Sequence, residues 1–194
     1  MVAMTVARTD LPSDRPLTTD DLCMLPDDGN RYELDNGVLV VTPSPTFGHQ
    51  RVAHRLAVAL DAACPADFEV LPGSGVQISR IQYRFPDIIV IRAGTVGSTD
   101  NSATEPPVLA VEVASPSTAS YDLSRKKDVY ARFGIESYWI VTPDTEMPSL
   151  MAFELRRGRY HLLTEARADD VFRATRPFAC GIVPAALVAG PWRR

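Results

Sequence analysis

The chain has 194 residues, of which 45% are hydrophobic; this is enough to bury one ordinary core, and we expect a single domain. Its 20 basic and 24 acidic residues give a net charge of −4, which argues against a general positive field over the surface but allows a local basic groove. The three cysteines are widely spaced and indicate neither a disulfide framework nor a zinc site. No apolar run has the length of a signal peptide or a membrane span, so we expect a cytoplasmic protein without a membrane partner.

The N-terminal part of the chain predicts an arm, a short helix and a hairpin. Residues 1–16 are expected to form a flexible arm, and residues 17–194 the domain. Residues 18–25 favour a short helix, because a threonine cap and two acids begin it. Residues 31–41 predict a β-hairpin around Asp35-Asn36-Gly37, since such a turn needs residues that tolerate positive φ.

Two polar residues in this half of the chain are candidates for a site, and each has a structural alternative. Glu33 lies in the first hairpin strand, where an exposed acid at a sheet edge fits the sequence equally well. Residues 47–63 have the periodicity of an amphipathic helix. His49 projects onto its apolar face and His54 onto the opposite face. His49 is therefore either a site residue or, like most such histidines, merely packed in the core.

Carboxylates interrupt two of the apolar strand candidates in the middle of the chain. Asp87 follows Pro86, and because proline is tolerated only near a strand start or at an edge, we expect Asp87 at the end of a sheet. Glu112 stands within the next apolar strand, where an ionised carboxylate must be paired, protonated or bound to a cation. The strand candidates are residues 68–71, 76–81, 84–91 and 108–114, and residues 93–107 are expected to form a loop.

The only two lysines of the chain are adjacent, in a predicted helix over residues 122–133. At about 100° per residue, Lys126 falls near the middle of the apolar stripe of this helix, whereas Lys127 lies roughly 90° away at its edge. Lys126 is therefore expected to point toward the sheet that carries Glu112. The alternative is a solvated lysine whose stem covers apolar surface.

The last part of the chain predicts one crossover unit and one hairpin. Residues 108–142 read as strand, helix and strand, which indicates two parallel strands joined by a right-handed crossover. Residues 150–155 and 160–163 predict a hairpin around the basic turn from Arg156 to Arg159. This turn is either a solvated loop tip or a contact to nucleic acid.

Two carboxylates and a lysine are thus expected in one part of the sheet. Asp87 and Glu112 repel one another and lose solvation there, and a divalent cation is the usual resolution. Oxygen ligands suit Mg²⁺ or Mn²⁺, which also bind phosphate oxygens. A metal-activated water would then attack a phosphodiester. Lys126 would orient or deprotonate this water, or stabilise the charge on the phosphate. The alternative is a buried ion-pair network without chemistry.

Six short motifs follow one another in a specific order. They are Arg31-Tyr32-Glu33-Leu34 with Gly37, His49-Gln50-Arg51, Phe85-Pro86-Asp87, Val-Glu-Val-Ala-Ser-Pro-Ser over residues 111–117, Asp122 with Lys126 and Tyr130, and Tyr138-Trp139-Ile140-Val141. From about Leu17 to about Val188 the chain resembles the PD-(D/E)xK nuclease superfamily and, more narrowly, the Uma-type family of predicted restriction endonucleases, once catalogued as a domain of unknown function.

The resemblance implies a restriction-endonuclease-like α/β fold, in which helices flank a mixed sheet and extra hairpins lie at the N-terminal and C-terminal ends. The site residues that it implies are catalytic Asp87, Glu112, Lys126 and Glu33, the metal ligands Asp87, Glu112 and the Val113 backbone carbonyl, and an accessory His49. One position departs from the superfamily pattern, in which the lysine follows the glutamate by two residues. Ala114 stands there, and the lysine is displaced to the following helix, at Lys126.

We therefore expect an endonuclease that uses Mg²⁺, or Mn²⁺, to hydrolyse DNA, and a homodimer is consistent with cutting both strands of a duplex. One rival is a catalytically inactive nucleic-acid-binding or interaction module of the same fold, which metal-dependent loss of DNA would exclude. The other rival is a phosphodiesterase that acts on RNA or small nucleotides. A comparison of duplex DNA, single strands and nucleotides would identify it.

Overall fold

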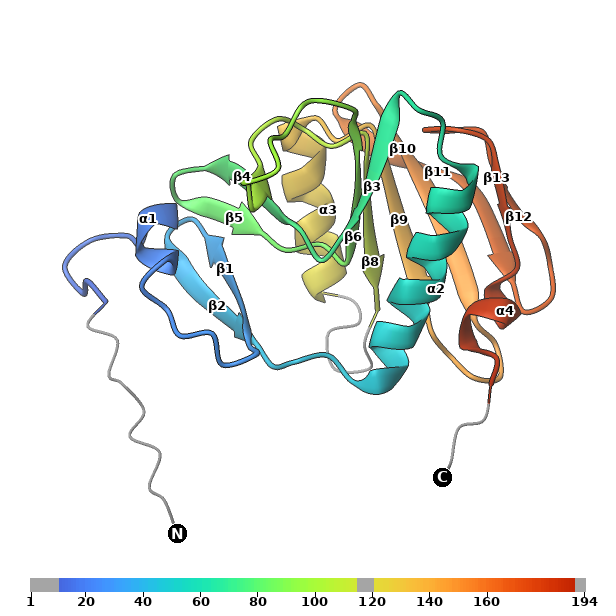
Figure 1. Ribbon diagram of the computed structural model, residues 1–194, viewed down its shortest axis with the longest axis horizontal. Helices are drawn as coiled ribbons and strands as arrows, with labels where there is room; N and C mark the ends of the chain where they lie inside the picture. Colours follow the sequence, from blue (N-terminus) through green and yellow to red (C-terminus); the bar gives the residue numbers. More distant parts are fainter. Residues whose placement is uncertain (1–10, 115–120, 191–194) are drawn as a thin grey trace, which may run out of the picture.

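The computed structural model describes residues 11–114 and 121–190, and of residues 121–123 it describes the backbone alone. In this part of the chain two larger β-sheets lie side by side, with helices on both faces of the larger one (Figure 1). The predicted α/β fold class is therefore confirmed. Residues 115–117 of the fourth sequence motif and the side chain of Asp122 lie outside the described residues.

The larger sheet has six strands in the order β11-β10-β9-β8-β6-β3 (Figure 1). Its strands are β3 (Phe68–Pro72), β6 (Ile88–Arg92), β8 (Leu109–Val113), β9 (Ser137–Thr142), β10 (Ser149–Arg156) and β11 (Arg159–Arg167). β8 and β9 are parallel, and α3 (Tyr121–Phe133) connects them. The other strand pairs of this sheet are antiparallel. The predicted strand-helix-strand unit and the C-terminal hairpin are thus confirmed.

The smaller sheet has five strands in the order β2-β1-β5-β4-β7. Its strands are β1 (Arg31–Asp35), β2 (Val38–Thr42), β4 (Gly75–Ser79), β5 (Gln82–Arg84) and β7 (Ser102–Ala103), the last within the expected loop. The prediction of one strand over residues 84–91 is wrong, because β5 and β6 belong to different sheets. Phe85, Pro86 and Asp87 carry the chain between them, and Pro86 has no N–H to offer to a ladder.

The turn of the N-terminal hairpin has the predicted backbone. Asn36 and Gly37 have φ values of 52° and 79°, and a Cβ on Gly37 would lie 2.4 Å from the Cβ of Pro16. Glycine is therefore needed there both for its backbone freedom and for its size. Of the expected N-terminal arm, residues 11–16 are described, and Arg15 bonds Asp21 at 2.8 Å. The boundary between arm and domain stays a prediction.

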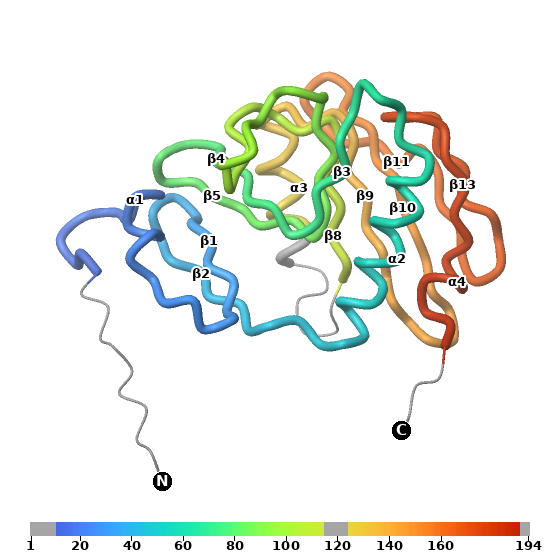
Figure 2. Tube along the Cα trace, in the orientation of Figure 1, coloured from blue at the N-terminus to red at the C-terminus, as the bar shows by residue number. Residues whose placement is uncertain are grey.

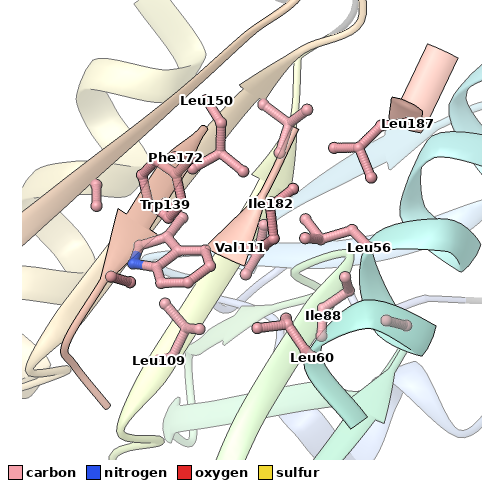
Figure 3. Packing of buried hydrophobic residues seen from close by; sticks show 14 of the residues in the cluster. Leu56, Leu60, Ile88, Leu109, Val111, Trp139, Leu150, Phe172, Ile182 and Leu187 are labelled. Carbon is pink, nitrogen blue, oxygen red and sulfur yellow. The ribbon is translucent and has the colours of Figure 1, made fainter. Parts of the chain in front are cut away.

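Helices cover the two faces of the six-stranded sheet. On one face lie α2 (Phe47–Ala63), α4 (Pro184–Val188) and the two-stranded sheet of β12 (Phe172–Ala174) and β13 (Cys180–Ile182). Figure 3 shows Leu56 and Leu60 of α2 turned toward this core, which includes Val111 and Trp139. α3 covers the opposite face with Tyr130, which packs in one cluster with Ala110 of β8.

Alternation along β8 decides which face each residue meets. Val111 and Val113 belong to the core under α2, whereas Ala110, and with it Glu112, lies on the α3 face. In Figure 2 the N-terminal end of α2 lies close to the C-terminal end of β8. The short α1 (Thr19–Leu22) begins after the predicted Thr18 cap. No helix in the described ranges has both the length and the apolar character that crossing a bilayer requires.

Candidate functional site

Four elements and the segment just before β6 bring the sequence-predicted site residues together near the C-terminal end of β8. The residues are Glu33 of β1, His49 of α2, Asp87 just before β6, Glu112 and Val113 of β8, and Lys126 of α3. The cluster lies where the two sheets meet, because β1 belongs to the smaller sheet and β8 to the larger one. The roles of these residues stay predictions.

Asp87 lies at the point where the chain enters the larger sheet, as its position after Pro86 predicted. Its side chain is only 2% exposed, and Oδ2 accepts a hydrogen bond of 2.8 Å from the N–H of Val113. Oδ1 accepts a bond of 2.5 Å from the Arg31 guanidinium. Burial raises the pKa of the Asp87 carboxyl, but hydrogen bonding and charge from His49, followed by the Arg31 bond, outweigh burial and leave this pKa below its usual value.

Glu112 is buried near the C-terminal end of β8, on the face that α3 covers. Both carboxylate oxygens lie 3.2 Å from Nζ of Lys126, and Oε1 accepts a hydrogen bond of 2.8 Å from the Tyr130 hydroxyl. Burial, the largest cause, raises the pKa of Glu112 to about 7, and the charges of Asp87 and Glu33 act in the same direction. Lys126 and Tyr130 oppose this rise but do not cancel it.

Lys126 points into the cluster, whereas Lys127 points away from it. Nζ of Lys126 lies 3.2 Å from Glu33 as well as 3.2 Å from Glu112. Nζ of Lys127 lies 3.4 Å from the centroid of the Phe153 ring, in a cation–π contact. The two neighbouring lysines therefore occupy different faces of α3, as the helical periodicity predicted.

Glu33 is buried, so the alternative of an exposed acid at a sheet edge is wrong. β1 lies inside its sheet, between β2 and β5. Oε1 of Glu33 accepts a hydrogen bond of 2.9 Å from the N–H of Phe85, and Arg84 lies 3.9 Å from Oε2. Arg84 is itself buried and also bonds Asp35 at 2.9 Å. Glu33 thus has a fixed position from which it faces Lys126.

His49 lies in the first turn of α2, which the Thr46 side chain caps by accepting from the His49 N–H at 3.3 Å. Nε2 of His49 is 3.1 Å from the Val113 carbonyl oxygen and 3.2 Å from Oδ2 of Asp87. Among the described residues, nothing bonds its buried Nδ1. His54 is exposed. The His49 side chain therefore faces the site, which is one of the two positions that its place on the apolar face of the helix left open.

The oxygen atoms of the cluster suit a hard cation. The Val113 carbonyl and Asp87 Oδ2 converge on one atom, Nε2 of His49, which must carry a hydrogen because both neighbours are acceptors. Burial raises the pKa of Glu112, and a cation bound beside this carboxylate would favour its charged form. In the described ranges no three side chains of His, Cys, Asp or Glu form a metal cluster. Two carboxylates, one backbone carbonyl and water would suit Mg²⁺, which prefers oxygen ligands.

Sequence reasoning gave no role to two residues that contact the acids of the cluster directly. Arg31, which bonds Asp87, is two residues before Glu33 and therefore on the same face of β1. Tyr130, which bonds Glu112, is four residues after Lys126 and therefore on the same face of α3. Both spacings are visible in the sequence, but the partners of these residues are not.

Comparisons with known proteins agree with this fold. A family model described as putative restriction endonuclease, Uma2, matches residues 19–187. The chain is also similar to the crystal structure of a putative nuclease belonging to DUF820 from Anabaena variabilis ATCC 29413, with a TM-score of 0.65 and 15% identity over 82% of this chain and 89% of that one. At this identity the likeness concerns the fold. No curated protein matches the chain. Since the family match spans most of the sequence, the chain belongs to the Uma2 family of putative restriction endonucleases.

Proposed function

We propose that the chain is a Mg²⁺-dependent endonuclease that hydrolyses phosphodiester bonds of DNA. The observation that carries this proposal is the position of Lys126, whose ammonium lies 3.2 Å from both Glu112 and Glu33 while Asp87 borders the same cluster. The family and the fold support the broader assignment as a nuclease. Hydrolysis of a phosphodiester depends on positioned charges of this kind, because charge develops on the phosphate in the transition state.

Five residues of the cluster have a part in this proposal. Asp87, Glu112 and the Val113 carbonyl would hold Mg²⁺. When bound, the ion would supply an activated water and neutralise charge on the phosphate. Lys126 donates hydrogen bonds toward the charge that develops on the phosphate. Glu33, whose carboxylate lies 3.2 Å from Nζ of Lys126, keeps the ammonium directed at the site.

DNA is the proposed substrate because restriction endonuclease, the description of the family, names a class that cuts DNA. The net charge of −4 requires that DNA contacts come from a local group of basic residues. Arg31, which is partly exposed, contacts Asp87 of the cluster, and the exposed Arg125 pairs with Asp35, two residues after Glu33. The homodimer and the cytoplasmic location expected from the sequence stay predictions.

The test compares Lys126→Ala with Lys127→Ala, a matched pair from adjacent positions of α3. Cleavage of plasmid, duplex and single-stranded DNA, RNA and nucleotides is measured with Mg²⁺, with Mn²⁺ and with EDTA. Wild type and Lys127→Ala are expected to cut DNA only with a metal. Lys126→Ala should lose at least about 100-fold in rate, the loss typical for one charge-stabilising donor.

Three outcomes would contradict parts of the proposal. Equal losses in the two lysine variants would contradict the separate placement of Lys126. Preferential cleavage of RNA or nucleotides would move the substrate to another class. Binding of DNA without cleavage under every metal condition would favour the inactive binding module.

A further inference from the structure

Both carboxylate oxygens of Asp87 have partners in the protein itself. Oδ2 bonds the backbone N–H of Val113 at 2.8 Å and faces His49 at 3.2 Å. Oδ1 bonds one nitrogen of the Arg31 guanidinium at 2.5 Å. The donor of the Val113 bond is a backbone N–H of β8, so it cannot move away from Asp87 independently of the strand. A cation that approaches Asp87 therefore meets Arg31 on the other oxygen.

We propose that Arg31 is an exchangeable counter-ion of this site. Its guanidinium neutralises Asp87 in the metal-free protein, leaves Asp87 when the metal ion binds, and then binds a phosphate of the substrate. This inference rests on the proposed function and assigns a positioning residue to it. A guanidinium and a divalent ion on one carboxylate repel one another, so each weakens the binding of the other by the same factor.

The surroundings of Arg31 allow this movement. Its side chain is 25% exposed, whereas that of Asp87 is 2% exposed, so the arginine can turn toward solvent without uncovering the core. The guanidinium carbon lies 5.4 Å from the centroid of the Phe85 ring. A flat aromatic face attracts a cation without fixing its direction, so this contact does not by itself hold the guanidinium on Asp87. The planar fork of arginine also suits the two oxygens of a phosphate.

Arg84, the other arginine beside the acids of β1, has the opposite character. Its side chain is 3% exposed, and it bonds the Leu34 carbonyl at 2.8 Å and Asp35 at 2.9 Å. A backbone bond and a buried carboxylate hold Arg84 in place. Arg84 therefore fixes the acids of β1, whereas Arg31 is the arginine with access to both Asp87 and solvent.

The test measures metal and DNA binding separately from cleavage. Metal-free wild type and Arg31→Met are titrated with MnCl₂ by calorimetry. Arg31→Met should bind Mn²⁺ more tightly by about five- to a hundredfold, the usual range for two coupled binding events. The control is Arg80→Met, which removes another arginine–aspartate pair at 2.9 Å, with Asp20, on the exposed surface. Its affinity for Mn²⁺ should equal that of wild type.

DNA binding is then measured by fluorescence anisotropy with Mn²⁺ present, in Lys126→Ala protein so that the DNA stays intact. Adding Arg31→Met should weaken binding and reduce the slope of log K against log salt concentration by about 0.9, the value for one phosphate contact. Arg31→Gln, whose amide can still donate to Asp87, carries the same expectations and replaces Arg31→Met if that variant does not fold.

The outcomes separate this inference from the proposed function. Equal Mn²⁺ affinities of wild type and the Arg31 variants would overturn the exchange alone. Tighter Mn²⁺ binding with unchanged DNA binding would overturn the transfer to phosphate. Absence of Mn²⁺ binding in all of the proteins would overturn the proposed function and the exchange together.

Discussion

We predict that Glu112 makes the metal-free protein less stable as the pH rises. Its pKa is about 7 in the folded chain, chiefly because burial disfavours the charged form, and 4.5 is its ordinary value. The folded state therefore holds the proton more tightly than the unfolded state. The stabilisation is fully present below pH 4.5 and is lost as the pH rises to about 7.

The size of the effect follows from the two pKa values. Their difference, 7 minus 4.5, corresponds to about 3 kcal/mol at roughly 1.4 kcal/mol per pKa unit. Asp87 acts in the opposite direction, because its pKa is lowered, and its contribution is lost only as the pH falls below its ordinary value of 3.8. Between pH 5 and 8 the contribution of Glu112 is therefore separated from that of Asp87.

The assay is urea denaturation in EDTA at pH 5 and at pH 8, for wild type and Glu112→Gln. Wild type should lose about 2–3 kcal/mol of unfolding free energy between these pH values, and Glu112→Gln should lose little of it because an amide does not titrate. Glu136→Gln, at an exposed glutamate, is the control and should behave as wild type. If Glu112→Gln kept the wild-type pH dependence, the reasoning would be refuted.

Three further variants test neighbouring parts of the account. Tyr130→Phe removes the 2.8 Å bond to Glu112 and should lower the free energy of unfolding at pH 8 by about 1.5–3 kcal/mol in urea denaturation, as expected for a bond to a charged group; no loss would contradict that bond. Leu56→Ala should cost about 2–5 kcal/mol because Leu56 is fully buried, against at most about 0.5 kcal/mol for exposed Val58→Ala, and similar losses would contradict the packing under α2. Glu33→Gln should slow DNA cleavage by at least about tenfold with unchanged DNA affinity, and an unchanged rate would remove Glu33 from the site.

Local patterns in the sequence predicted a large part of the fold. The Asn36-Gly37 turn, the helix of residues 47–63 and the crossover unit depend on neighbouring residues, and the structure confirms them. The orientation of Lys126 followed from the 3.6-residue period of its helix. This period depends only on the helix itself and not on contacts with distant segments.

The remaining features depend on contacts between distant segments. The apolar run over residues 84–91 looks continuous, but β5 pairs with β1 of the N-terminal hairpin and so belongs to the other sheet. The same pairing places β1 inside a sheet and buries Glu33. The sequence alone could not decide whether Glu33 is buried or exposed at a sheet edge. The bond between Arg31 and Asp87 joins residues 56 positions apart, and no local period indicates such a pair.

Metal-dependent cleavage by wild type and Asp87→Asn, prepared identically, tests the central claim most directly. The rate of duplex DNA cleavage is measured against Mg²⁺ concentration, with Asp144→Asn as a control at an exposed aspartate. The account predicts that wild type and Asp144→Asn cut with the same dependence on Mg²⁺, while Asp87→Asn does not cut. Cleavage by all three proteins at equal rates, or cleavage that continues in EDTA, would contradict a metal-dependent site at Asp87.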